Sequence, residues 1–232
     1  MQSYRTIFIW DVQGCYDELK LLIKKLKLKK NDKVYFVWDL VNRWPKSYKV
    51  IKYLYKNKTK FSCVKWNHEL NFLNLLKWEK NLDHKHFKKI KQKIEENKTN
   101  FLIKYLESLP LYIEEDNFIL IHGWLIPNKK IEEHTELEIT NLRDFNWKPW
   151  YEYYKWDKPI IYWHWAEESL QIREKTKWLD SWCAYWKALT AYILETWEVI
   201  QQNALDCYID IYKGNNNFLK KVKNIFQKNI WR

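Results

Sequence analysis

Glycine is nearly missing from this chain of 232 residues, which contains only three. At the usual frequency of about 7%, a chain of this length would hold roughly sixteen. Tryptophan deviates in the opposite direction, with sixteen residues. Because the excess of one residue matches the deficit of the other, we expect that many tryptophans occupy positions that the gene specifies as glycine. UGA codons that mean glycine but are read as tryptophan would produce this pattern.

Long apolar runs and paired cysteines are also missing. No stretch approaches the ~18–20 apolar residues of a membrane helix, so a spanning segment is excluded. The first residues lead straight into a strand-like run and do not resemble a secretory signal. The four cysteines form no C-x-x-C pair, which favours a reducing, cytoplasmic location; they are Cys15, Cys63, Cys183 and Cys207. A hydrophobic content of 47% and a charged content of 30% are typical of a globular protein.

Arginine is scarce although the net charge is +12, since only five of the 41 basic residues are arginine. Arginine reads bases and phosphates better than lysine does, so this charge is weak evidence for nucleic acid as the main partner. The charge does favour anionic substrates. One alternative of another class stays open, namely a non-catalytic RNA-binding protein whose tryptophans are real and stack on bases.

Short apolar runs alternate with helical patterns in the first part of the chain. Runs at 6–9, 34–37 and 61–64 each end in a polar turn, and helical spacing follows each one. This order predicts an α/β layer architecture. Further strands are expected at 118–121 and 159–162, with a hairpin over 189–200.

The domain organisation is expected to be simple. One domain covers residues 1–206, with a Lys-rich helical insert at about 69–108. Residues 207–232 form a Lys/Asn-rich tail with one amphipathic helix.

Five of the expected strands end beside a residue that can bind a metal ion. These residues are Asp11, Asp39, Asn67, His122 and His164. Ligands at the carboxyl ends of separate strands converge on one edge of an α/β sheet. Carboxylate, amide and imidazole groups suit a two-metal centre that hydrolyses phosphate esters.

Tryptophans stand beside all five of these residues. Trp10, Trp38, Trp66 and Trp163 each precede one of them, and Trp124 follows His122-Gly123. Turns of this kind need a positive φ or a close backbone approach, which glycine allows and an indole does not. With glycine there, and at 44, the motifs read G-D-V-Q-G-C, G-D-L-V-N-R-G-P, G-N-H-E, H-G-G and G-H-W. Trp150 and Trp165 fit as true tryptophans.

With those motifs, from Ile9 to about Lys187, the chain resembles the calcineurin-like metallophosphoesterases of the phosphoprotein-phosphatase type. It is most similar to the bacterial symmetrical bis(5'-nucleosyl)-tetraphosphatases, with bacterial serine/threonine protein phosphatases as the alternative. The resemblance implies a hydrolase of α/β class, with two packed mixed sheets flanked by helices. It also implies a dinucleoside polyphosphate as substrate, or a phosphoprotein for the alternative.

The resemblance further implies two divalent transition-metal ions, Mn²⁺ before Co²⁺, Ni²⁺, Fe or Zn²⁺. Asp39 would bridge the two ions. The first ion would be bound by Asp11 and Gln13, where Gln13 replaces the histidine of most relatives. The second ion would be completed by Asn67, His122 and His164.

Three further residues receive roles from the resemblance. His68 would be the general acid that protonates the leaving oxygen. Arg43 and Arg143 would bind phosphate oxygens. By contrast, His134 lies in a Glu-rich stretch and is expected to be solvated.

Overall fold

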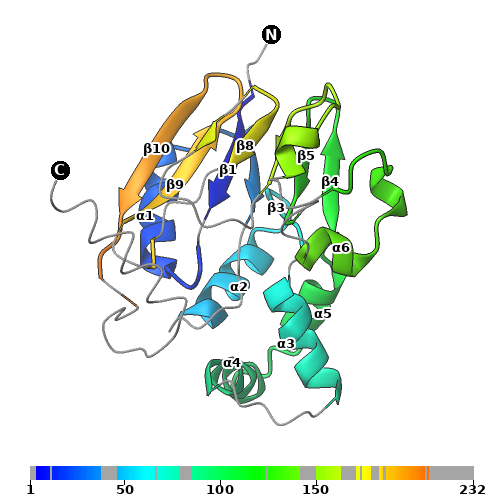
Figure 1. Ribbon diagram of the computed structural model, residues 1–232. Coiled ribbons are helices and arrows are strands. Elements are labelled where there is room, and N and C mark those ends of the chain that lie inside the picture. The colour runs from blue at the N-terminus through cyan, green and yellow to red at the C-terminus, as the bar shows by residue number, and fades with distance from the viewer. Residues whose placement is uncertain are drawn as a thin grey trace, which may run out of the picture.

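The computed structural model describes most of the chain (Figure 1). The described residues are 4–10, 12–37, 46–65, 67–78, 85–123, 125–141, 150–162, 171–172, 174–178, 183–184, 187–206 and 208. Among them, no helix is long and apolar enough to cross a membrane. The expected tail helix lies outside the described residues, and the boundaries of the domain and tail stay a prediction.

Two five-stranded mixed sheets form the centre of the fold, as expected. The first has the order β10-β9-β1-β2-β3. Its strands β1, β2 and β3 are parallel, whereas β9 runs antiparallel to β1 and to β10. The strand bounds are β1 Thr6–Trp10, β2 Lys33–Phe36, β3 Phe61–Cys63, β9 Ala188–Ile193 and β10 Glu198–Asn203.

The second sheet has the order β4-β5-β6-β8-β7. Strands β5, β6 and β8 are parallel, and the two edge strands β4 and β7 are antiparallel to their neighbours. The strand bounds are β4 Tyr112–Glu115, β5 Phe118–Ile121, β6 Ile160–Ile161, β7 Gln171–Ile172 and β8 Thr176–Trp178. The sequence analysis identified neither β4, β7 nor β8, which are short and carry little apolar pattern.

Helices α1 Tyr16–Leu26 and α2 Ser47–Lys56 pack with the face of the first sheet that points away from the second sheet. Further helices pack on α2 and on one another; they are α3 Asn67–Trp78, α4 Lys85–Glu96 and α5 Phe101–Ser108. The last three fall in the range expected for the helical insert, and Figure 1 shows them together at one end of the molecule. Later in the chain come the helix α6 Glu136–Asn141 and two short 3-10 helices, η1 Ile131–Glu133 and η2 Trp150–Tyr153.

Alternation along β1 explains how the layers are held together. Successive side chains of a strand point to opposite faces. Ile7 and Ile9 pack among the helices, whereas Phe8 and Trp10 pack against the second sheet. All five residues of β1 are buried, so its continuous apolar run is the mark of a strand covered on both faces.

The hairpin between β9 and β10 contains a strained residue. Trp197 has a φ of 62°, a conformation that costs an L-residue with a side chain about 1–2 kcal/mol. Hairpin loops that contain a left-handed residue favour glycine there. The indole is 57% exposed, and Lys177 Nζ lies 4.4 Å from its ring centroid.

We predict that Trp197→Gly is more stable than Trp197→Ala by about 1 kcal/mol, because both variants lose the ring and only glycine relieves the backbone. Urea unfolding of the two variants measures the difference. Equal stability of the two would show that the turn is not strained at this residue.

Candidate metal centre

The first candidate ligand lies in the tight turn between β1 and α1. The Cys15 amide donates to the Val12 carbonyl at 2.5 Å, and the Tyr16 amide donates to the Gly14 carbonyl at 2.9 Å. Gln13 takes a φ of 34° in this turn and is only 8% exposed. Its Oε1 atom is buried and accepts no hydrogen bond from the residues that the structure describes.

The second candidate is Asn67, the first residue of α3, which follows β3 along the chain. Its Oδ1 atom is also buried and accepts no hydrogen bond within the described part of the chain. A buried acceptor that lacks a donor costs about 1–3 kcal/mol. Within the described part of the chain, each of these two oxygens is therefore available to a ligand.

The third candidate, His122, directly follows β5 and is 1% exposed. The next residue fixes the chain at this point, since the Gly123 amide donates to the Ile139 carbonyl at 2.7 Å. A Cβ at Gly123 would lie 2.3 Å from that carbonyl oxygen. Only glycine permits this close approach.

The packing of the two sheets brings these three residues to one edge. At the first residue of β2, Lys33 Nζ lies 3.4 Å from Glu115 Oε2, and Glu115 ends β4 just before β5 begins. Strands β2 and β5 therefore start at the same edge, and their carboxyl ends share the opposite edge. Gln13, Asn67 and His122 all follow carboxyl ends of this parallel set.

The other predicted site residues cannot be placed in the same way. Asp11, Asp39, Arg43, Arg143 and His164 lie outside the described residues. The backbone of His68 lies in α3, but its side chain is outside the described part.

The described residues fit a divalent metal ion in their chemistry. Amide oxygens and an imidazole are ligands that Mn²⁺ and related ions accept. Within the described ranges, no group of three or more His, Cys, Asp or Glu residues is placed to bind a metal. The two aspartates of the predicted set lie outside those ranges.

An ion pair connects the residues that follow two of the sequence motifs. Lys46, which follows the motif at 38–45, pairs with Asp17 in the first turn of α1. The hydrogen bond from Lys46 to Asp17 raises the pKa of Lys46. Sequence spacing gave no sign of this contact, because the two residues are 29 positions apart.

The sequence expectation for His134 was wrong. The residue is 8% exposed, and its Nε2 accepts from the Ile126 amide at 2.7 Å. Its Nδ1 lies 2.8 Å from the Lys130 carbonyl oxygen. The imidazole thus holds the loop that follows His122, a role that the polar neighbours of His134 concealed.

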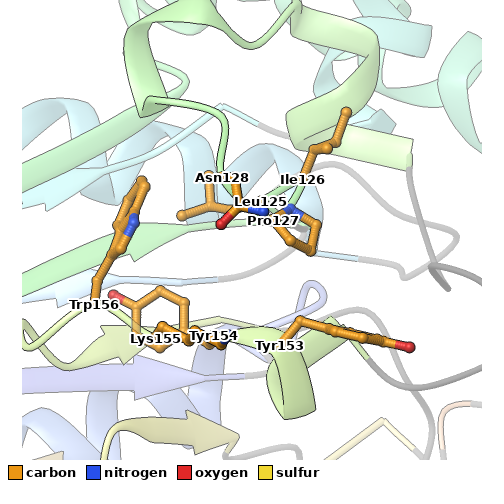
Figure 2. Close-up of a pocket in the computed structure, with 8 residues that line it drawn as sticks. All are labelled: Leu125, Ile126, Pro127, Asn128, Tyr153, Tyr154, Lys155 and Trp156. Carbon is orange, nitrogen blue, oxygen red and sulfur yellow. The ribbon is translucent and has the colours of Figure 1, made fainter.

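This loop borders a small cavity on the outer side of the second sheet (Figure 2). Residues 125–128 line one side and residues 153–156 the other. The volume is about 60 Å³, which is room for a few ordered water molecules.

Curated relatives share part of the sequence. The symmetrical bis(5'-nucleosyl)-tetraphosphatase of Wigglesworthia glossinidia brevipalpis is 31% identical over 159 residues, which cover 59% of this chain and 54% of the relative. The protein of the same name from Pseudomonas putida (strain W619) is 30% identical over 135 residues, covering 57% of this chain and 46% of the relative. The tetraphosphatase of the same name from Buchnera aphidicola subsp. Acyrthosiphon pisum (strain 5A) is 44% identical over 71 residues, which cover 29% of this chain and 25% of the relative. The chain thus spans between a quarter and about half of these relatives, and no protein-family model matches it.

Solved structures agree in architecture. A candidate diadenosine tetraphosphatase superposes with a TM-score of 0.72 at 24% identity, covering 87% of this chain and 94% of the other. The metallophosphoesterase of Sphaerobacter thermophilus superposes with a TM-score of 0.54 at 13% identity, covering 88% and 89%. The chain has the metallophosphoesterase fold. The resemblance stated from the motifs is therefore confirmed.

We predict that Gln13→His tightens Mn²⁺ binding about tenfold, or roughly 1.4 kcal/mol, because imidazole is a better ligand than a carboxamide. Histidine also tolerates the positive φ at this position. Isothermal titration of the metal-free protein measures the dissociation constant. Gln202→His is the matched control, since Gln202 is also 8% exposed but lies on β10. An equal gain in both variants would exclude Gln13 as a ligand.

Proposed function

We propose that the chain is a metal-dependent hydrolase of phosphoric ester or anhydride bonds, acting in the cytoplasm. The proposed substrate is a dinucleoside polyphosphate such as diadenosine tetraphosphate, cleaved symmetrically. The observation that carries the proposal is the pair of buried amide oxygens, Gln13 Oε1 and Asn67 Oδ1, that follow the ends of parallel strands in this fold. The substrate class is supported by the relatives, which are named symmetrical tetraphosphatases.

The proposed chemistry divides between metal ions and side chains. Two divalent ions, Mn²⁺ first, would activate the attacking water and offset the charge that develops on phosphorus. Asp11, Gln13, Asp39, Asn67, His122 and His164 would hold the ions. Arg43 and Arg143 would orient the phosphate oxygens through paired N–H donors. His68 would donate a proton to the leaving oxygen.

The proposal also concerns the tryptophans. We infer that glycine stands at most tryptophan positions of the natural protein, with Trp150 and Trp165 as exceptions. Two observations support this: Trp197 has a positive φ, and the buried Nε1 of Trp10 donates to no described residue. Burial of Trp10 between the sheets also argues against the RNA-binding alternative, because a buried indole cannot stack on a base.

Peptide mass spectrometry of the natural protein tests this inference. We expect glycine masses at positions 10, 38, 66, 124 and 163. Tryptophan at all five positions would overturn it and would revive the aromatic RNA-binding alternative.

We predict that the protein converts diadenosine tetraphosphate to two ADP, only with added Mn²⁺ or Co²⁺, and stops after chelation. Symmetric cleavage gives ADP as the only nucleotide product, and anion-exchange chromatography separates ADP from ATP and AMP. ATP plus AMP would reject the regiochemistry, and full activity after exhaustive chelation would reject the metal mechanism. Brisk phosphopeptide hydrolysis with no tetraphosphate turnover would favour a protein phosphatase.

Replacing the proposed acid should separate catalysis from metal binding. His68→Asn is expected to lower kcat about 10²–10⁴-fold, the usual contribution of a positioned proton donor. Its metal content should stay at the wild-type level, as measured by elemental analysis. Asp39→Asn, in contrast, should lose metal. If His68→Asn also loses metal, His68 is a ligand and not the acid.

A further inference from the structure

Glu18 is a fully buried carboxylate outside the predicted site. It lies in the first turn of α1 and is 0% exposed. A buried carboxyl group is retained at little cost only where hydrogen bonds compensate it, and within the described residues only the Oε1 atom of Glu18 has such bonds. The N-terminus of a helix adds a favourable field for a negative group.

The donors to Glu18 come from the chain segment that follows β10. Its Oε1 accepts from the Leu205 amide at 3.0 Å and from the Tyr208 hydroxyl at 2.8 Å. Burial raises the pKa of Tyr208, and the hydrogen bond to Glu18 adds to that rise. One carboxylate oxygen thus joins α1 to Leu205 and Tyr208, which lie 187 and 190 positions later in the chain.

The same segment is also fixed to a second loop. The Tyr208 amide donates to the Ala184 carbonyl at 3.2 Å, and the Ala204 amide donates to the Lys187 carbonyl at 2.8 Å. At the other end of α1, Lys25 Nζ donates to the Gln201 carbonyl at 3.0 Å. Helix α1 is therefore held at both ends by β10 and the segment after it.

Helix α1 continues directly from the turn that carries Gln13. The Leu19 amide donates to the Cys15 carbonyl at 3.0 Å, and Cys15 closes the turn through its bond to Val12. The first turn of α1 and the turn that carries Gln13 are therefore joined by backbone hydrogen bonds. The Glu18–Tyr208 contact joins that first turn to the segment after β10.

We propose that Glu18 and Tyr208 are positioning residues for the Gln13 turn, so that residues 204–206 and Tyr208 belong to the metal-site scaffold and not to a dispensable tail. This inference rests on the proposed function for its metal. It concerns only residues of this chain, and part of it can be tested without any metal.

The test compares two tyrosine-to-phenylalanine variants of the full-length protein. Tyr208→Phe removes the donor to Glu18, and Tyr35→Phe removes the donor to Glu115. Both hydrogen bonds measure 2.8 Å and join a phenol to a glutamate, but the Tyr35 hydroxyl binds Glu115 where β5 begins, away from the Gln13 turn. Hydrogen–deuterium exchange of residues 12–19 is measured in metal-free protein, and the Mn²⁺ dissociation constant is measured by isothermal titration.

We expect amide exchange over residues 12–19 to be about tenfold faster in Tyr208→Phe and unchanged in Tyr35→Phe. The Mn²⁺ dissociation constant should rise three- to tenfold only in Tyr208→Phe, and kcat should be restored at saturating Mn²⁺. This expected loss of affinity is smaller than the about 10–100-fold loss caused by removing a direct partner of a metal ligand, because the Glu18–Tyr208 contact is more remote from the metal. Unchanged exchange in Tyr208→Phe, or equal effects in both variants, would overturn the proposal. If wild-type protein binds no Mn²⁺, the proposed function fails, while the exchange result still decides the role of Glu18 and Tyr208.

Discussion

Face-to-face packing of the two sheets is the constraint on which the site depends. Phe118 of β5 packs edge-on against Phe8 and Tyr35, with ring centroids 4.9 and 5.0 Å apart. Such aromatic pairs contribute about 0.5–1.5 kcal/mol each beyond the area they bury. Lys33, the first residue of β2, pairs with Glu115, which ends β4 just before β5 begins, so β2 and β5 run in the same direction from one edge. Because the strands share this direction, the turns after β1, β3 and β5 lie at one edge.

Most of this arrangement could be predicted from local sequence. The apolar runs of β1, β2 and β5 are continuous, that of β3 is interrupted only by Ser62, and each is followed by a polar turn, so strand positions and site residues follow from the same pattern. The short strands β7 and β8 carry no such run, and their pairing depends on contacts distant in the chain. Glu18 and His134 were also unpredictable as buried groups, because their partners, Tyr208 and the Ile126 amide, have no fixed spacing from them.

The tryptophans mark where sequence and fold disagree. Local preferences in a natural chain usually agree with its fold, yet Trp197 takes a backbone conformation suited to glycine, and Trp10 buries an N–H that donates to no described residue. Gly123 shows the opposite case, since a Cβ there would meet the Ile139 carbonyl. The proposed misreading of codons predicts such tryptophans at positions that favour glycine.

The central claim is that Gln13, Asn67 and His122 converge on bound metal ions. A crystal structure with Mn²⁺, with anomalous diffraction recorded at the manganese edge, tests it most directly. The account predicts two peaks about 3.5–4 Å apart, one beside Gln13 Oε1 and the other beside Asn67 Oδ1 and the His122 imidazole. Peaks elsewhere, or none at saturating Mn²⁺, would contradict it.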